Sequence, residues 1–431
     1  MATVPRSPAT PPATLRTEDV PARQSGAELV GSVQTGREPS EAGSPGSVLV
    51  LAVLGALVFL NVYAPQSLLP LLAHDLKVTP VTAGSVVGAT TLAIALISPL
   101  SGLLADALGR KRVIVTAFVL LVLPALLATQ AGTLAQLNLA RFLQGLIIPL
   151  VMVTCTAYAA EEYRGREQGG TGVGRAITAY VTGTVLGGFG GRFLSGLLVE
   201  YQGDDWRLAF WLLAVTNLLG ALLTGTLLRS ARHFIPARNL KTVGRDFALH
   251  LHNRALLGTL LVGFVLLFTL VSAFTYVVLY LAAPPYRLGS AALGGVFAVY
   301  LLGVLVTPLA SRIMGRYGVP RTFGVGVAFS LLGLGLTLLA PLPLIVLGLA
   351  LASCGVFIGQ ATALSAVQAN VTRARSLAAG LYNMAYYAGG AAATVLGGLA
   401  YTHAGWPGAV LCSAVALLLA LAVGLRIWGS L

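Results

Sequence analysis

The chain has 431 residues, of which 56% are hydrophobic and only 10% are charged. An ordinary soluble domain carries about 25% charged residues, so this composition excludes a soluble fold. The 51 glycines and the mean hydropathy of +0.85 are typical of a membrane protein with many helical spans. Each such span needs about 20 apolar residues.

Several function classes are excluded by the charge and motif pattern. The formal net charge of +13 does not indicate a nucleic-acid partner, because the basic residues are distributed among short loops. Cys155, Cys354 and Cys412 lie in apolar runs without CxxC spacing, and the five histidines form no HExxH pair. A G-x-x-x-x-G-K-S/T phosphate loop is also absent from the sequence. We therefore expect no metal site, no cofactor and no enzyme.

The first segment, residues 1–47, is predicted to be a disordered cytoplasmic tail. It holds 7 of the 21 prolines, no aromatic residue, and 4 arginines against 5 acidic residues. Such a segment cannot bury enough apolar surface to offset the entropy of ordering. It also lacks the apolar core of a cleaved signal peptide, so the first span is expected to act as the insertion signal.

Twelve apolar segments follow the tail, separated by polar residues or by glycine and proline breaks. They fall at about 48–72, 82–105, 113–131, 134–158, 176–199, 207–228, 255–282, 291–314, 322–341, 343–366, 376–400 and 407–428. The fold class predicted from this pattern is an all-α membrane protein with twelve transmembrane helices.

The distribution of basic residues predicts the orientation of these spans. Loops after even-numbered spans carry 17 lysines and arginines, whereas loops after odd-numbered spans carry 3. Because cytoplasmic loops are enriched in basic residues, both termini are expected to face the cytoplasm. The expected location is a bacterial-type plasma membrane, the cell inner membrane.

The two halves of the chain repeat one another. Ser98-Pro99-Leu100 precedes Gly109 by the same distance at which Thr307-Pro308-Leu309 precedes Gly318. A duplicated six-span unit is typical of a transporter that rocks two bundles around a central site. We therefore expect two pseudo-symmetric six-helix bundles, at 48–228 and 255–431, joined by a cytoplasmic linker loop at 229–254.

The loop after the second span resembles a signature of the major facilitator superfamily. It reads GLLADALGRKR over residues 102–112, similar to the pattern G-x-L-A-D-x-x-G-R-K/R, and the resemblance to the family extends over about 48–428. A charged loop of this kind can hold one conformation closed. The residues expected to form this conformational latch are Gly102, Asp106, Gly109, Arg110, Lys111 and Arg112.

The fourth span contains Arg141-Phe142-Leu143-Gln144-Gly145, similar to the R-x-x-Q-G signature of the same superfamily. Arg141 lies roughly 10 Å from the outer boundary, where a charge is costly and faces the bundle interior. The resemblance implies that Arg141 and Gln144 take part in proton coupling. A purely structural hydrogen-bonding role is the alternative.

The fifth span combines small residues with a second deep arginine. Gly183, Gly187 and Gly191 recur every four residues and predict a stripe for close helix packing. The segment resembles the antiporter signature of efflux members, with Gly188 where that motif usually has proline. Its ending at Arg192 is similar to the YnfM-type twelve-span efflux branch, among the drug:proton antiporters.

Arg192 has two readings. It lies at a depth where the sequence places no carboxylate, so if it faces the interior, Arg141 and Arg192 together suit an anionic or strongly polar substrate. It can instead extend outward to Glu200 or Asp204. We group it with the coupling residues.

Candidate substrate-binding residues are the amide and aromatic side chains of the spans. Asn383, Tyr386 and Tyr387 share one helical face by their spacing, and Tyr276 and Tyr280 share another. Aromatic surfaces of this kind suit amphipathic ligands, although interfacial anchoring of the tyrosines is the alternative. The full set is Asn61, Tyr63, Gln66, Phe274, Tyr276, Tyr280, Tyr300, Gln360, Asn383, Tyr386 and Tyr387.

The sequence therefore predicts a secondary active transporter that works by alternating access. The favoured activity is proton-coupled efflux of small amphipathic compounds or drugs by a monomer in the lipid bilayer. A carrier of an anionic or sugar-like metabolite is the alternative within transport. A membrane receptor or integral membrane enzyme is the alternative outside it. Because the first span lacks an acidic residue, Asp106, Glu161 and Glu162 are the expected cytoplasmic proton acceptors.

Overall fold

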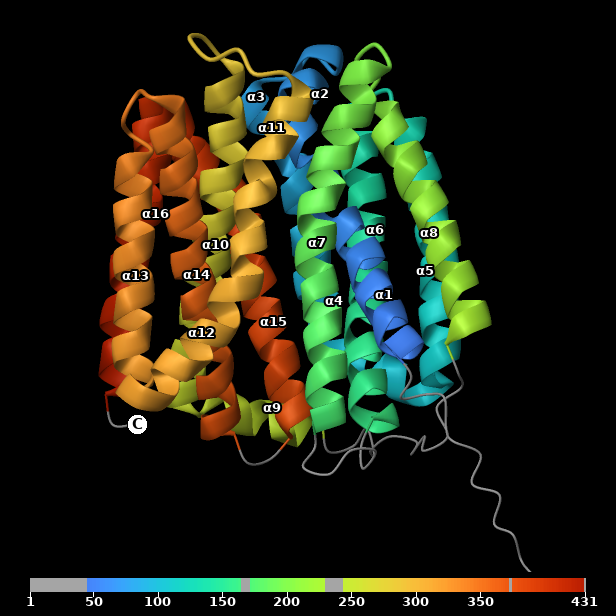
Figure 1. Cartoon of the computed structure of the whole chain (residues 1–431), viewed down its shortest axis with the longest axis vertical. Helices are drawn as coiled ribbons and strands as arrows, with labels where there is room; N and C mark the ends of the chain where they lie inside the picture. The colour runs from blue at the N-terminus through green and yellow to red at the C-terminus, as the bar shows by residue number, and fades with distance from the viewer. Residues whose placement is uncertain (1–44, 164–170, 229–242, 372–373, 430–431) are drawn as a thin grey trace, which may run out of the picture. The chain divides into compact units, whose positions relative to one another are not determined.

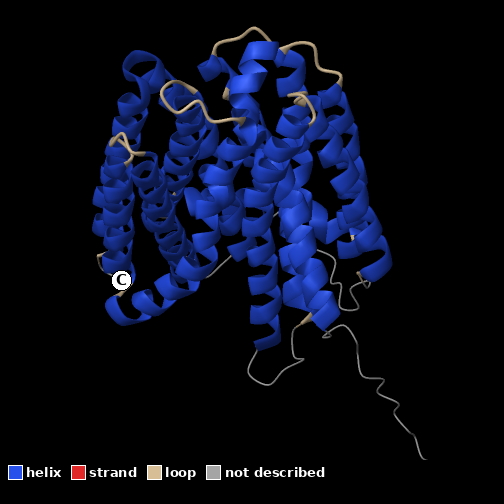
Figure 2. Ribbon diagram, turned by 45° about the horizontal axis from the view of Figure 1, so that its top comes forward, coloured by secondary structure: helices blue, strands red, loops and turns tan. Residues whose placement is uncertain are grey.

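The apolar segments fold into long helices joined by short connections (Figure 2). The computed structural model describes residues 45–163, 171–228, 243–371 and 374–429, and no strand occurs among them. All of these residues belong to one compact unit that covers Glu41–Leu431. The tail expected at 1–47 lies outside the described residues except for its last three.

Within the described residues, the first half of the chain forms eight helices and one 3₁₀ turn. Their bounds are α1 (Pro45–Tyr63), η2 (Ala64–Leu68), α2 (Leu69–Asp75), α3 (Pro80–Ala83), α4 (Ser85–Leu108), α5 (Arg110–Thr129), α6 (Leu134–Glu162), α7 (Thr171–Tyr201) and α8 (Arg207–Leu227).

The second half begins with a short helix, α9 (Val243–Leu251), inside the segment that was expected to be a linker loop. The elements that follow are α10 (Arg254–Ala282), α11 (Ser290–Val296), η4 (Phe297–Leu301), α12 (Leu302–Tyr317), α13 (Val319–Leu336), α14 (Leu342–Asn370), α15 (Arg375–Ala392), η5 (Ala393–Gly397) and α16 (Gly398–Trp428). The 3₁₀ turn η4 and the π-helical turn η5 interrupt longer helical runs.

Ten helical stretches of the described chain are long and apolar enough to span a membrane. Helix α7, which covers the expected span 176–199, is not among them. One stretch, Leu377–Trp428, contains both of the last two expected spans. Ala404 and Gly405 leave the helical conformation between those two spans. The expected number of twelve spans thus remains a prediction.

Two glycines at duplicated positions adopt the same unusual backbone conformation. Gly109, between α4 and α5, has φ +83°, and Gly318, between α12 and α13, has φ +81°. Residues other than glycine rarely adopt a φ in this range, because their Cβ atom clashes with the backbone. The tight turns that reverse the chain at these two points therefore require glycine, and the repeat seen in the sequence extends to local geometry.

The helices pack in two sets (Figure 1). In the first set, α7 packs on α1, and α6 packs on α4 and α5. In the second, α10 packs on α14, α15 and α16. The two sets meet where α4 contacts α15 and where α7 contacts α11. We call the end of the helices near α9 the α9 face and the opposite end, near α2, α3 and α11, the α11 face (Figure 1).

Large apolar side chains cover the outer surface of the described helices. Leu305 is 71% exposed, Leu411 65% and Leu123 60%. Patches of this extent are unfavourable in water and favourable against lipid tails. Together with the ten candidate spans, they identify an integral membrane protein.

Candidate functional site

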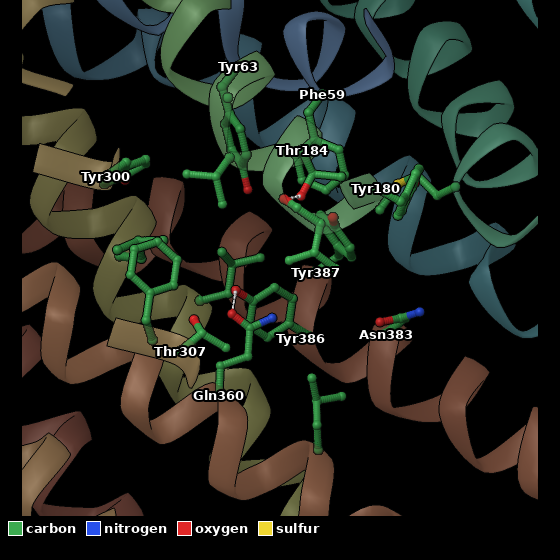
Figure 3. A pocket seen from close by; sticks show the side chains of 18 of the residues that line it. Phe59, Tyr63, Tyr180, Thr184, Tyr300, Thr307, Gln360, Asn383, Tyr386 and Tyr387 are labelled. Atoms are coloured by element: carbon green, nitrogen blue, oxygen red, sulfur yellow. Dashed lines mark hydrogen bonds between the residues drawn. The ribbon is translucent and has the colours of Figure 1, made fainter. Parts of the chain in front are cut away.

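A cavity of about 330 Å³ lies between the two sets of helices. This volume is within the range of small-molecule sites. Figure 3 shows its aromatic and amide side chains converging from several helices. Its lining comprises Phe59, Tyr63, Met152, Val153, Thr156, Tyr180, Val181, Thr184, Val185, Gly188, Arg192, Leu267, Leu270, Tyr300, Thr307, Phe357, Gln360, Ala361, Leu364, Asn383, Tyr386 and Tyr387.

Helix α15 contributes a polar aromatic face to this cavity. Asn383, Tyr386 and Tyr387 all line it, as their shared helical face led us to expect. The hydroxyl of Tyr386 donates to Oε1 of Gln360 on α14 at 3.1 Å (Figure 3). This bond orients both side chains toward the centre of the cavity, so the second set of helices supplies hydrogen-bonding groups without formal charge.

Arg192 lies inside the protein at the edge of this cavity. Its side chain is 2% exposed, and its guanidinium carbon lies 4.4 Å from the ring centres of Tyr63 and Phe297 and 4.9 Å from that of Tyr300. The aromatic rings stabilise the cation by cation–π attraction. The interpretation in which Arg192 extends outward to Glu200 or Asp204 is therefore wrong. Glu200, its suggested partner, instead accepts a hydrogen bond from the Ala291 backbone N–H at 2.7 Å.

Gln66 connects Arg192 to the second set of helices. Its Oε1 accepts from Arg192 Nε at 2.8 Å, and its Nε2 donates to the Thr275 hydroxyl on α10 at 2.8 Å. The hydroxyl of Ser67 donates to the Arg192 carbonyl at 2.8 Å. These bonds close the protein between the cavity and the α11 face, and we call this layer the roof.

The backbones of α7 and α11 also approach closely in the roof. A Cβ atom added to Gly196 would lie 2.2 Å from the carbonyl oxygen of Ser290. A Cβ atom added to Gly294 would lie 2.6 Å from the carbonyl oxygen of Arg192. Because only glycine permits such approaches, the roof depends on one glycine from each set of helices.

The glycine stripe of α7 lies against α1. Added Cβ atoms would lie 1.9 Å from Ala52 O at Gly183, 2.0 Å from Ala56 O at Gly187 and 2.7 Å from Leu60 O at Gly191. Helix α1 therefore rests directly on the α7 backbone over about two turns. This packing holds Tyr63 and Arg192, from the two helices, in contact beside the cavity.

Arg141 occupies a different place, behind the cavity. Its guanidinium donates to the carbonyl oxygens of Asn61 at 2.8 Å and Val62 at 2.6 Å. Pro65 has no N–H to complete the helical bond to Asn61, so α1 breaks there into η2. Arg141 supplies the missing donors, and Gln144 Oε1 accepts from it at 2.5 Å. This geometry favours the structural alternative for Arg141.

We expect Arg141→Lys to reduce stability while leaving the binding affinity of the folded fraction unchanged. A lysine ammonium lacks the planar fork, so it cannot serve both carbonyls and Gln144 together. Hydrogen bonds to charged groups are each worth about 1.5–3 kcal/mol. Thermal unfolding in detergent would measure the loss. Wild-type stability with abolished coupled flux would instead support the coupling role.

The expected latch is only partly described. The burial of Gly102 and the side chain of Asp106 are outside what the structure describes, Lys111 is half-buried and Arg112 is exposed. Arg110 is buried and donates two hydrogen bonds to Glu161 on α6, from Nε at 3.1 Å and from the terminal nitrogen at 2.6 Å. This bidentate pair joins α5 to α6 at the α9 face.

Five candidate binding residues do not line the cavity, which corrects the sequence interpretation. Asn61 pairs with Asn217 on α8, and Gln66 belongs to the roof. Phe274 packs behind Tyr300 with ring centres 4.5 Å apart. The remaining two, Tyr276 and Tyr280, turn toward α16, where they stack on Tyr401 and Trp406. Their shared face was inferred correctly from the spacing, but it packs against protein.

Other lining residues were not singled out from the sequence. They are Phe59, Thr156, Tyr180, Thr184, Thr307 and Phe357. Threonine and phenylalanine are common throughout the spans, so type alone gives no signal. Tyr180 carries such a signal. In this part of the repeat the offset is 206 residues, which pairs Tyr180 with Tyr386 as it pairs Gly183 with Gly389, and both tyrosines line the cavity. Symmetry between the halves was thus the available indication.

Metal ligation has no support among the described residues. No group of three or more His, Cys, Asp or Glu side chains suited to a metal ion occurs in the described ranges. The three cysteines are unpaired thiols, and Cys155 is buried. The chemistry available at the cavity is therefore binding by aromatic rings, hydroxyls, amides and one guanidinium.

Comparison with known proteins gives a consistent result. A family model described as Major Facilitator Superfamily matches residues 51–394 and, in a second match, 286–429. The inner membrane transport protein YnfM of Escherichia coli (strain K12) is 31% identical over 380 residues, 88% of this chain and 89% of YnfM. The uncharacterized MFS-type transporter YybF of Bacillus subtilis (strain 168) is 30% identical over 368 residues, 85% of this chain and 89% of YybF.

Solved structures share the fold at lower identity. The nucleoside transporter NupG superposes with a TM-score of 0.72 and 17% identity, over 88% of this chain and 99% of NupG. The peptide transporter POT in complex with alafosfalin superposes with a TM-score of 0.68 and 16% identity, over 89% and 95% of the two chains.

Proposed function

Because the chain belongs to the major facilitator superfamily, whose members similar to it are membrane transporters rather than enzymes, we propose that it moves a small amphipathic compound by alternating access. The observation that carries the proposal is the cavity of about 330 Å³, whose lining comes from both sets of helices. A site built by two bundles changes its access when they rock against each other.

We assign the α9 face to the cytoplasm and place both termini there, following the bias of 17 basic loop residues to 3. The lining residues of α6 and α14 lie in the halves of these helices nearer the α9 face. The roof closes the opposite side. These features support an inward-facing state, in which a compound enters from the cytoplasm and leaves after the roof opens.

Proton coupling is the finer part of the proposal. The part of the chain that the structure describes contributes no acidic residue to the cavity lining, so we look for a proton acceptor outside the cavity. Glu161 is 25% exposed at the α9 face and bound to the buried Arg110. Protonation of Glu161 would break this ion pair between α5 and α6, which makes it our candidate coupling group in the described chain.

We expect Glu161→Gln to separate proton coupling from transport itself. The variant keeps the size of the side chain but removes the charge that pairs with Arg110. Flux driven by a pH gradient should fall at least tenfold, while exchange without a gradient continues. Asp75→Asn is the control, because Asp75 pairs with Arg207 away from Glu161, beside the α11 face. Unchanged gradient-driven flux in Glu161→Gln would contradict this role.

The experiment that tests the function is a flux screen in proteoliposomes that contain a pH-sensitive dye. Anionic, neutral and cationic amphipathic compounds are supplied in turn, and compound and proton movements are recorded together. We expect saturable flux of one class, with protons moving in the opposite direction. If no compound crosses faster than in protein-free liposomes, the proposal is wrong.

A second candidate, a carrier of anionic metabolites, is favoured by one observation. Arg192 lines the cavity, although Arg141, which was expected to join it, does not. The two candidates differ in the charge of the ligand rather than in the transport cycle, and the geometry around Arg192 bears on that charge.

A further inference from the structure

We propose that the compound carried is an aromatic monoanion, with its carboxylate bound by Arg192 and its ring held among the tyrosines of the cavity. This inference rests on the proposed function, because it takes the cavity as the transport site. It narrows the substrate to one charge class and excludes the cationic compounds that an aromatic cavity alone would admit.

The first step is the lack of a counter-charge. Arg192 forms no ion pair within the described residues, and it is the one cationic side chain in the cavity lining. A buried charge without a partner destabilises the protein. The aromatic rings offset part of this effect, but they bring no negative charge. An anion that enters the cavity would complete the pair.

The second step is the number of hydrogen-bond donors that remain. A guanidinium carries five N–H donors. Within the described chain, Arg192 uses Nε for Gln66 and one terminal nitrogen for the carbonyl of Gly188. Three N–H donors are left without an acceptor among the described residues. Donors on a planar fork match the two oxygens of a carboxylate.

The third step is the shape and polarity of the rest of the cavity. Arg192 and Tyr180 lie roughly 18 Å apart along α7 at 1.5 Å per residue. Between these two residues the cavity lining is mainly apolar and aromatic. The amides of Gln360 and Asn383 reach the cavity from the second set of helices, across from α7. An elongated ligand with an anionic head and an aromatic body fits both regions.

The fourth step concerns the amount of charge. A cationic ligand would meet Arg192 in a cavity lined by no acid, so repulsion would oppose its binding. A dianion would leave one negative charge without a partner in the same low-dielectric space. Of the simple charge classes, only a monoanion leaves the occupied cavity neutral.

The test uses three probes of similar size and different charge: 4-phenylbutyrate, 4-phenylbutyramide and 4-phenylbutylammonium. Binding to the purified full chain in nanodiscs is measured by calorimetry at neutral pH. We expect the anion to bind at least tenfold more tightly than the amide and the cation to bind most weakly. Equal affinities, a preference for the cation, or binding of none of the three would overturn the inference.

Two variants test whether Arg192 causes the preference for the anion. Arg192→Gln should remove the preference, so that the anion binds no more tightly than the amide in this variant. Arg207→Gln is the matched control, because Arg207 is also an arginine but lies outside the cavity, bound to Asp75. If Arg192→Gln does not fold, Arg192→Lys is used. It should keep the preference at lower affinity.

Failure of this inference is distinguishable from failure of the proposed function. If the chain transports but binds a neutral or cationic compound, the flux screen shows saturable movement of that class and calorimetry shows no anion preference. If the chain is not a transporter of this kind, no compound shows saturable flux, whatever the calorimetry shows.

Discussion

Gly196→Leu is expected to hold the transporter open toward the α11 face. No side chain fits between α7 and α11, since even a Cβ atom at this position would lie 2.2 Å from Ser290 O. That contact is with backbone, which cannot rotate away as a side chain can. The two sets of helices must therefore separate at the roof, and the population shifts toward the state with the roof open.

The separation is measurable as a distance between the two sets. Spin labels at Gln202, just after α7, and at Arg287, just before α11, are both on exposed positions. We expect a short distance in the wild-type background and a longer one in Gly196→Leu. Gly190→Leu on the same helix is the control, because a Cβ atom there meets nothing within 4 Å. An unchanged distance in a folded Gly196→Leu variant would contradict the account of the roof.

Gly187→Ala is expected to cause a large loss of stability from a single added methyl group. The new Cβ atom would lie 2.0 Å from Ala56 O, so α1 and α7 must move apart along their whole contact. Overpacking costs about 1–3 kcal/mol and more where backbone is blocked. Because α1 carries Tyr63 into the cavity, binding should weaken as well.

The matched control for Gly187→Ala is Gly190→Ala, three residues further along α7. It makes the same chemical change where no atom lies within 4 Å. Alanine should there stabilise the helix by up to about 1 kcal/mol. Thermal unfolding of both purified variants shows whether helix packing or helix propensity controls the change in stability. Equal melting temperatures would show that the close contact at Gly187 does not limit stability.

Much of the fold was predictable because the bilayer imposes simple rules on the sequence. Long apolar segments and the shared face of Asn383, Tyr386 and Tyr387 follow from local periodicity. Each depends on residues a few positions apart. The helix at 243–251 was missed, since it lies in a polar segment where composition favoured a loop.

The partners of the buried polar residues were not predictable. Pro65 marks a break in α1, but only the folded structure places Arg141 against the carbonyl oxygens that this break leaves without a donor. The prediction that Tyr276 and Tyr280 point into the cavity was also wrong, because α10 buries side chains around nearly its whole circumference. A helix surrounded by protein has no apolar stripe to indicate which side faces the cavity.

The most direct test of alternating access is the reactivity of one cavity residue from each side of the membrane. Thr184→Cys is placed in a background without the native Cys155, Cys354 and Cys412, and a membrane-impermeant thiol reagent is added to right-side-out or everted vesicles. Thr184 lines the cavity beneath the roof. We predict labelling from the cytoplasmic side alone in this background, and strong labelling from the outside once Gly196→Leu is added. Labelling from the same side in both backgrounds would contradict the account.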